Sequence, residues 1–261
     1  MGVINVTPDS FSGDALGNNP RAVFEKARRF LDEGADLLDI GAESTRPGFR
    51  PIHHPEERER LLPVLDKIAL LPIVLSLDTR KPEILEESLP YGIQLINDVG
   101  GLSDPGFSRL MKEHSELLAV LMHSPEPAGT LHGKTLGKGS PKPVGEYFAR
   151  RLDALRADGL DPGRFLLDPG LGFGKDTTGN LALLHSIPPW SQGHPVLLGP
   201  SRKRFLGDIA KEPVPDKRDP ATLVIQIWGH TQNVAMFRTH NVSFALQGRR
   251  VFEALRSGEW A

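Results

Sequence analysis

Short apolar runs alternate along the whole chain with stretches in which apolar residues recur every three or four positions. The first pattern predicts buried strands and the second predicts amphipathic helices. The predicted strands cover residues 2–6, 37–40, 73–77, 95–96, 117–122, 165–167, 196–198 and 234–237. The predicted helices cover residues 21–33, 55–69, 82–89, 107–112, 144–157, 181–184, 221–228 and 244–255.

Strands that alternate with helices from end to end predict an α/β protein with a parallel sheet. Eight predicted strands favour a closed (β/α)8 barrel of the TIM type over an open, doubly wound sheet. The segment 124–143 is rich in Gly, Pro, Lys and Ser, but strand and helix patterns continue beyond it. We therefore interpret it as a long loop and expect one domain that spans residues 1–261.

Composition narrows the classes of function. The 261 residues are 39% hydrophobic and 25% charged, with a net charge of −2, so nothing indicates a nucleic-acid-binding surface. We expect no membrane span, because no apolar run reaches about 18 residues, and no signal peptide before the first strand. The chain has no cysteine, which excludes disulfides, thiolate metal sites and a cysteine nucleophile. We expect a cytoplasmic protein.

Polar residues follow the predicted strands, where an α/β barrel places its chemistry. Taken singly, Asp9, Ser44, Thr79 and Asp98 are best interpreted as helix caps or turn formers. The whole set points to a site, because caps alone do not require Arg and Lys at the same rim. The set comprises Asn5, Thr7, Asp9, Asp39, Glu43, Ser44, Thr45, Arg46, Asp78, Thr79, Lys81, Asn97, Asp98, Met122, His123, Asp168, Ser201, Arg202, Lys203, Arg238 and His240.

Three of these residues suit a flat heterocycle. Asp168 can accept two parallel hydrogen bonds from an amidine-like ring edge, and Asp78 and Asn97 offer further acceptors and donors. The glycines after Asp168 let the backbone approach a flat ligand, although the segment 168–175 could equally be a simple connection with Lys175 in solvent. Its spacing is neither that of a phosphate-binding P-loop nor that of a dinucleotide fingerprint.

A second group suits an anion. Arg238 and His240 are two residues apart, so they share one face if the chain is still extended there. Together with Arg46 they could bind phosphate. His240 alone would be interpreted as a half-exposed loop histidine.

These segments resemble dihydropteroate synthase. The segment 5–12 reads Asn-Val-Thr-Pro-Asp-Ser-Phe-Ser, and the segment 43–48 reads Glu-Ser-Thr-Arg-Pro-Gly, like the first two loop signatures of that family. The segments 78–79, 96–98, 122–123, 168–175, 201–203 and 238–240 follow in the family order. The resemblance covers essentially the whole chain.

The resemblance implies a (β/α)8 barrel that forms a homodimer, uses Mg²⁺ and has no redox cofactor. It implies an enzyme, a transferase that joins 6-hydroxymethyl-7,8-dihydropterin diphosphate to 4-aminobenzoate, releasing diphosphate and giving 7,8-dihydropteroate for folate biosynthesis.

The resemblance also assigns residues to each ligand. The pterin would be bound by Asp78, Asn97, Asp168 and Lys203, with Met122 and Phe173 lining its pocket. Diphosphate would be bound by Asn5, Arg238 and His240, with Thr45 and Arg46 nearby. The 4-aminobenzoate would lie among Phe11, Pro47, Ser201 and Lys203, and Mg²⁺ would be held by Asn5 and Asp9. Asn5, Lys203, Arg238 and His240 would be the catalytic residues.

The sequence departs from the family pattern at several loop positions. Gly13-Asp14-Ala15 replaces Asp-Gly-Gly, Ala42 stands where a second Gly is common, and residues 124–126 differ from the usual segment after Met-His. Asn241 follows His240 where Asp is usual. The short segment that commonly covers the barrel floor before the first strand is not expected. Every position of the predicted pterin pocket matches.

Two other functions would fit part of the pattern. A methyltetrahydrofolate-binding methyltransferase barrel shares the pterin pocket and hands a methyl group to a corrinoid, but it would not need the segment 201–203 or the anion-binding group. A non-catalytic pterin-binding protein would be compatible with the changes in the first loop.

Overall fold

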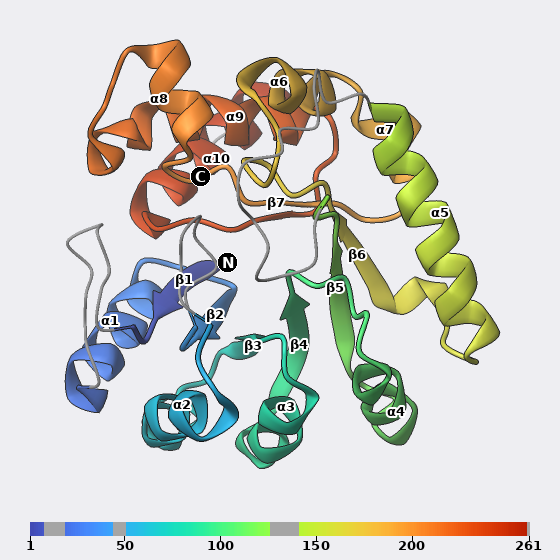
Figure 1. The fold of residues 1–261 in the computed structure, drawn as a ribbon. Helices are drawn as coiled ribbons and strands as arrows, with labels where there is room; N and C mark the ends of the chain where they lie inside the picture. Colours follow the sequence, from blue (N-terminus) through green and yellow to red (C-terminus); the bar gives the residue numbers. More distant parts are fainter. Residues whose placement is uncertain (8–18, 44–50, 126–140, 260–261) are drawn as a thin grey trace.

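The computed structural model describes residues 1–7, 19–43, 51–125 and 141–259. Within these ranges, parallel strands form an inner layer and helices lie around the outside (Figure 1). The strands are β1 (Gly2–Asn5), β2 (Leu37–Gly41), β3 (Val74–Asp78), β4 (Ile93–Asp98), β5 (Leu118–Met122), β6 (Phe165–Asp168), β7 (Leu197–Leu198) and β8 (Met236–Phe237). The helices are α1 (Pro20–Asp32), α2 (His54–Ile68), α3 (Pro82–Ser88), α4 (Pro105–Glu113), α5 (Pro141–Ala157), α6 (Thr177–His185), α7 (Ile187–Ser191), α8 (Arg204–Ala210), α9 (Asp219–Thr231) and α10 (Val242–Ser257), with short 3₁₀ helices η1 (Leu89–Tyr91), η2 (Pro162–Arg164) and η3 (Pro215–Arg218).

The strands close into a barrel. β1 to β6 form one sheet in chain order, and β7 pairs with β8. The two sheets meet at both edges, where Leu167 bridges to Val196 and Gly2 bridges to Thr239 in parallel fashion. The backbone N–H of Val3 donates to the carbonyl of Thr239 at 3.1 Å, which joins β1 to the end of β8. The predicted (β/α)8 barrel is therefore confirmed.

Local signals fix where each helix meets the next strand. The Asn19 side chain accepts hydrogen bonds from the backbone N–H groups of Arg21 and Ala22, and Pro20 occupies the first helical position of α1. One face of α1, including Val23 and Phe30, is buried against the strands. Gly34 has φ +91°, a left-handed conformation that lets the chain leave the helix and enter β2 three residues later.

Side chains that point alternately inward and outward along each strand form layers inside the barrel. A cluster of apolar side chains fills the part of the barrel interior nearer the amino ends of the strands. Its members are Met1, Leu37, Leu95, Val120, Leu166, Leu197 and Met236. Successive side chains of a strand point to opposite faces, so the residue two positions further on points inward again, one layer nearer the carboxyl end. That step leads to Asp39, Asn97, Met122, Asp168 and Arg238. The sequence thus places a layer that is polar except for Met122 next to this apolar cluster, on the side of the carboxyl ends of the strands.

The structure adds two helices to the predicted pattern. α7 was not predicted because Pro188 and Pro189 occur within its five residues. α8 was not predicted because its seven residues contain Gly207, which lowers helix propensity. The central part of the predicted loop, residues 126–140, lies outside the described residues.

Candidate active site

Asp39 organises the polar layer inside the barrel. Its carboxylate is fully buried, which is costly unless the charge is paired. It accepts hydrogen bonds from Ser76 Oγ at 2.6 Å, from Asn97 Nδ2 at 3.0 Å and from Arg238 Nε at 2.6 Å. Four strands thus contribute to one network, and the bond from Asn97 Nδ2 leaves the amide oxygen of Asn97 to face another partner.

Arg238 joins Asp39 to the next carboxylate. Its Nη2 donates to Asp78 Oδ2 at 2.7 Å, so one guanidinium bridges two acids from neighbouring strands. Burial raises the pKa of Asp78 to about 7, and the nearby Arg238 charge opposes this rise. The structure therefore brings Asp78 and Asn97 together, as predicted. It also places Arg238, which was predicted to belong to a separate anion-binding group, in direct contact with the carboxylate of Asp78.

Asp168 begins a glycine-rich turn at the end of β6. Its Oδ1 accepts a hydrogen bond from the N–H of Gly170 at 2.7 Å, and burial raises the pKa of its carboxyl group. Gly170 has φ +66°, and a Cβ there would lie 2.2 Å from the carbonyl oxygen of His123. Only glycine fits this position, so the turn holds the Asp168 carboxylate at the carboxyl end of the barrel.

Lys175 lies inside this turn and not in solvent, which corrects the alternative interpretation of the segment 168–175. Its side chain is buried, and Nζ donates to the carbonyl oxygens of Gly170 at 2.9 Å, Phe173 at 3.0 Å and His123 at 3.4 Å. An ammonium group has three donors and thus matches three carbonyls. Burial lowers the pKa of Lys175 to about 7, although Asp168 opposes this effect.

Lys203 lies over an aromatic ring from the same turn. Its Nζ is 4.2 Å from the centroid of the Phe173 ring, a cation–π arrangement. A Cβ at Gly172 would lie 3.1 Å from Cδ of Lys203, so the glycine allows the lysine stem to cross the backbone closely. Lys203 and Phe173 therefore meet at the rim, although they follow β7 and β6 respectively.

Ser201 and His240 also meet. The Oγ of Ser201 lies 3.1 Å from the backbone nitrogen of His240, which donates to it, and 2.9 Å from Nδ1 of the imidazole ring. His240 is a partly exposed loop histidine, and Ser201 of the neighbouring loop holds it. Asn5 ends β1 opposite Gly41, which itself pairs with Asp78, and Met122 ends β5 opposite Asp168. All described members of the predicted site lie at one end of the barrel.

Two residues of the larger polar set have structural roles. Asp98 accepts hydrogen bonds from the N–H groups of Gly100 and Leu102 at 2.7 and 2.8 Å, so its turn-forming role is confirmed. Thr79 donates to the buried carboxylate of Glu57 at 2.6 Å. Asp9, Phe11, Ser44, Thr45, Arg46 and Pro47, which were also predicted, lie outside the described residues.

Sequence reasoning missed specific roles for Asp39 and Lys175. Asp39 shows the inward alternation from Leu37 that also marks the other site residues, which is a usable signal. The burial of Lys175 has no such signal, because its partners are backbone carbonyls that any sequence supplies. In the part of the chain that the structure describes, no helix is long and apolar enough to cross a membrane.

Buried acids and an amide at the carboxyl ends of the barrel strands supply the acceptors that a multi-donor heterocycle needs. Residues 1–240 match the family described as "Pterin binding enzyme", and the chain belongs to that family. Within it, the chain belongs among the dihydropteroate synthases. The enzyme of that name from Neisseria meningitidis serogroup B is 35% identical over 261 residues, covering 98% of this chain and 92% of the relative.

Solved structures agree with this relationship. Dihydropteroate synthase from Xanthomonas albilineans with 4-aminobenzoic acid has a TM-score of 0.89 and 35% identity, covering 98% of this chain and 92% of that chain. The enzyme from Thermus thermophilus in complex with 4-aminobenzoate has a TM-score of 0.86 and 37% identity, with coverage of 98% and 93%. The Xanthomonas enzyme in complex with 7,8-dihydropteroate has a TM-score of 0.85 and 33% identity, with coverage of 98% and 93%.

Proposed function

We propose that this chain condenses 6-hydroxymethyl-7,8-dihydropterin diphosphate with 4-aminobenzoate, giving 7,8-dihydropteroate and diphosphate for folate synthesis. The observation that carries the proposal is the polar layer in which Asp39 orients Asn97 and Arg238 beside Asp78. Relatives crystallised with 4-aminobenzoate and with 7,8-dihydropteroate support it. The enzyme is a transferase, since the pterin methylene group passes from oxygen to nitrogen.

The pterin ring is bound by Asp78, Asn97 and Asp168. Asn97 donates to Asp39, so its amide oxygen accepts a ring N–H, and the carboxylate of Asp168 accepts two parallel N–H bonds from the ring edge. Met122, Phe173 and the stem of Lys203 border the ring. Two buried acids thus obtain partners that offset the cost of burying their charge.

Diphosphate is bound by Arg238, His240 and Asn5, with Thr45 and Arg46 nearby. Two of the five N–H donors of Arg238 go to Asp39 and Asp78, and others are directed to phosphate oxygens. Negative charge grows on the leaving diphosphate as the carbon–oxygen bond breaks, so cations held there in advance stabilise the transition state.

The arylamine lies on the other side of the methylene group. Lys203 pairs with the carboxylate of 4-aminobenzoate, Ser201 borders the same end, and Phe11 and Pro47 flank the ring. The carbon–oxygen bond breaks to leave a CH₂ cation that the electron-rich pterin stabilises. The amine nitrogen forms the new carbon–nitrogen bond and loses one proton to solvent or diphosphate. Asn5, Lys203, Arg238 and His240 are the catalytic residues, and no protein nucleophile is needed.

The donor set of the site fits Mg²⁺. This ion uses one or two protein oxygens together with substrate phosphates and water. Asn5, at the end of β1, would supply an amide oxygen, and Asp9, which lies outside the described residues, would be the second protein ligand. The described residues contain no cage of three or more His, Asp or Glu side chains. Bound Mg²⁺ would neutralise charge on diphosphate. A chelator should therefore suppress turnover more than it weakens pterin binding, and full turnover with negligible metal content would contradict this role.

The activity test is a diphosphate-release assay with both substrates, with the product identified by mass spectrometry. Release that depends on 4-aminobenzoate, together with formation of 7,8-dihydropteroate, supports the synthase. Tight pterin binding without turnover would instead support the non-catalytic pterin-binding protein. A spectral change on cobalamin titration would support the corrinoid methyltransferase.

The enzyme works as a cytoplasmic homodimer in this proposal. The absence of cysteine suits a reducing compartment. Exposed apolar side chains gather on α9 (Val224, Trp228) and α10 (Phe244, Val251, Leu255), two helices that pack together. We expect Val251→Glu to give a monomer in light scattering. Leu70→Glu, at an exposed position after α2 that lies away from α9 and α10, should leave a dimer (Figure 1).

A further inference from the structure

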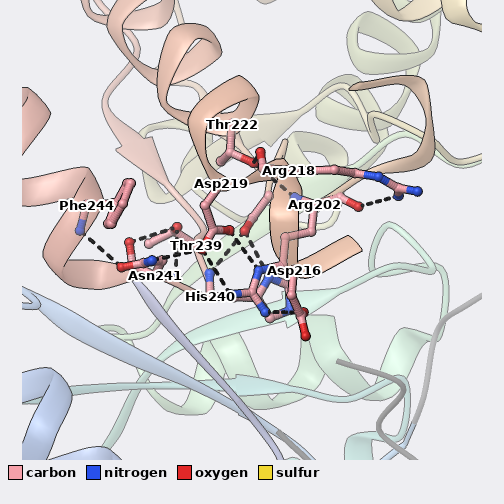
Figure 2. A network of polar contacts seen from close by, with 10 residues as sticks. Arg202, Asp216, Arg218, Asp219, Thr222, Thr239, His240, Asn241 and Phe244 are labelled. Atoms are coloured by element: carbon pink, nitrogen blue, oxygen red, sulfur yellow. Dashed lines mark hydrogen bonds and ion pairs between the residues drawn. The ribbon is translucent and has the colours of Figure 1, made fainter. Parts of the chain in front are cut away.

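A network of polar side chains joins the loop after β7 to the loop after β8 (Figure 2). The first loop carries Ser201 and Lys203, and the second carries His240. The start of α9 lies between them and contributes Asp219, which is buried. The Ser201–His240 contacts form one direct link between the loops, and Asp219 forms a second.

Asp219 holds Arg202, the residue between Ser201 and Lys203. The guanidinium donates to both carboxylate oxygens, from Nε at 2.8 Å and from Nη2 at 3.0 Å. Arg202 has φ +59°, in the left-handed region where a residue with a side chain needs support from its surroundings. That support also includes Thr222 Oγ1, which accepts from the N–H of Arg202 at 3.1 Å.

The backbone conformation of Arg202 matters because Arg202 lies between two predicted site residues in the chain, Ser201 and Lys203. Ser201 on one side contacts His240, and Lys203 on the other side lies over Phe173. A change in the backbone at Arg202 would rotate these two side chains relative to each other. By fixing the backbone at Arg202, the ion pair with Asp219 therefore fixes the relative orientation of the Ser201 and Lys203 side chains.

The same carboxylate holds the second loop. Oδ2 of Asp219 accepts a hydrogen bond from Nδ2 of Asn241 at 2.8 Å. The amide oxygen of Asn241 in turn accepts from the N–H of Phe244 at 3.1 Å and caps α10. Both ends of the Asn241 amide are thus engaged, and a carboxylate at position 241 would direct a second acceptor at Asp219.

We propose that Asp219 is a positioning residue for the condensation, because its carboxylate holds the Ser201–Lys203 loop and the His240 loop in one arrangement. This inference rests on the proposed function for what the loops bind: Lys203 and Ser201 the arylamine, His240 the diphosphate. The effect of Asp219 falls mainly on these two ligands, since only the stem of Lys203 also borders the pterin. The pterin carboxylates belong to β3 and β6, which the network does not include.

Four variants test the proposal. Asp219→Asn weakens the bidentate acceptor, and Asn241→Asp places two carboxylates at hydrogen-bonding distance. The double variant Asp219→Asn/Asn241→Asp restores one acid and one amide. Asp216→Asn is the matched control, because Asp216 also pairs with Arg202, at 2.7 Å, but is half exposed and has no bond to the β8 loop. Exposed pairs of this kind contribute little.

We expect each single variant at 219 or 241 to raise KM for 4-aminobenzoate and to lower kcat, together by on the order of 10- to 100-fold in kcat/KM. The double variant should be more active than either single variant, because the 219–241 bond is restored, but should stay below the parent, because an amide at 219 cannot accept both bonds from Arg202. Asp216→Asn should stay within about twofold of the parent, because exposed ion pairs contribute little. The dissociation constant for a pterin without diphosphate should change far less than kcat/KM, because within this network only the stem of Lys203 borders the pterin ring. The imidazole resonances of His240, assigned with His240→Gln, should move in Asp219→Asn and not in Asp216→Asn.

Two results would overturn the proposal. In the first, Asp219→Asn keeps the parent kinetics and the parent His240 resonances. In the second, melting temperature, pterin affinity and activity fall together and the double variant recovers none of them, which is the signature of a purely structural residue. A parent protein that forms no product would contradict the proposed function instead, and the His240 resonances would still decide the role of Asp219.

Discussion

In the proposed function, the ionisation of Asp78 sets the pH range in which the site binds a pterin. Its pKa is raised by burial to about 7, and the ring N–H groups need the ionised form. Affinity for a pterin ring should therefore fall as pH is lowered below 7, by up to about tenfold per pH unit. Calorimetry across this range measures the slope.

A control variant tests whether the slope comes from Asp78, and the raised pKa of Asp78 also affects stability. Lys175 titrates in the same range, so Lys175→Met should keep the slope, and loss of the slope would assign it to Lys175. Between pH 3.8 and about 7 the folded state binds more protons at Asp78 than the unfolded state does. Its contribution to the free energy of unfolding therefore decreases as pH rises through this window.

Asp168 offers a substitution that spares the fold. Its Oδ1 accepts from the N–H of Gly170, and an asparagine oxygen can keep that bond. Asp168→Asn should nonetheless almost abolish pterin binding, since each lost charge-assisted bond is worth about 1.5–3 kcal/mol. Binding within about threefold of the parent, which is less than 1 kcal/mol, would rule out the assigned role.

The turn after β6 depends on Lys175 as its internal support. Lys175→Met would leave the carbonyls of His123, Gly170 and Phe173 without their donor, and should lower the free energy of unfolding by about 2–4 kcal/mol. Urea unfolding measures the loss. Lys112→Met, at an exposed position of α4, is the control and should change stability by less than about 0.5 kcal/mol.

At the level of elements, the hydrophobic pattern predicted most of the fold. The strand predicted at 37–40 is β2, and the one predicted at 165–167 is β6, each one residue short. The predicted strand 234–237 shrinks to two residues because only Met236 and Phe237 pair with β7. Pattern finds buried strands reliably, whereas strand ends depend on register with a neighbour that is remote in sequence.

The candidate site could be predicted where residue type and position suffice. Asp78, Asn97 and Asp168 follow buried strands and have the acceptors that a heterocycle needs. The bridge from Arg238 to Asp39 joins residues 199 positions apart, so only the closed barrel brings them together. Pairing partners of this kind depend on topology, and residue type alone does not reveal them.

Strand pairing is uneven around the barrel. β1 to β6 form a continuous sheet of strands four to six residues long, whereas β7 and β8 have two residues each. We expect hydrogen exchange to be slower at the amides of Leu38, Ile40 and Leu77 than at those of Leu198 and Phe237. Mass spectrometry or NMR can compare the two regions, and equal protection would show that the short strands unfold only with the rest.

The hydrogen bond between Asp219 and Asn241 has a consequence for how related sequences diverge. One acid and one amide satisfy this pair, whereas two acids at that separation repel each other. An Asp at 241 is therefore tolerated only after the acid at 219 has been lost. In the opposite direction, an acid at 219 is tolerated only after the Asp at 241 has been lost. Across an alignment of relatives, the two columns should covary: sequences with Asp at the position of 241 should lack an acid at the position of 219.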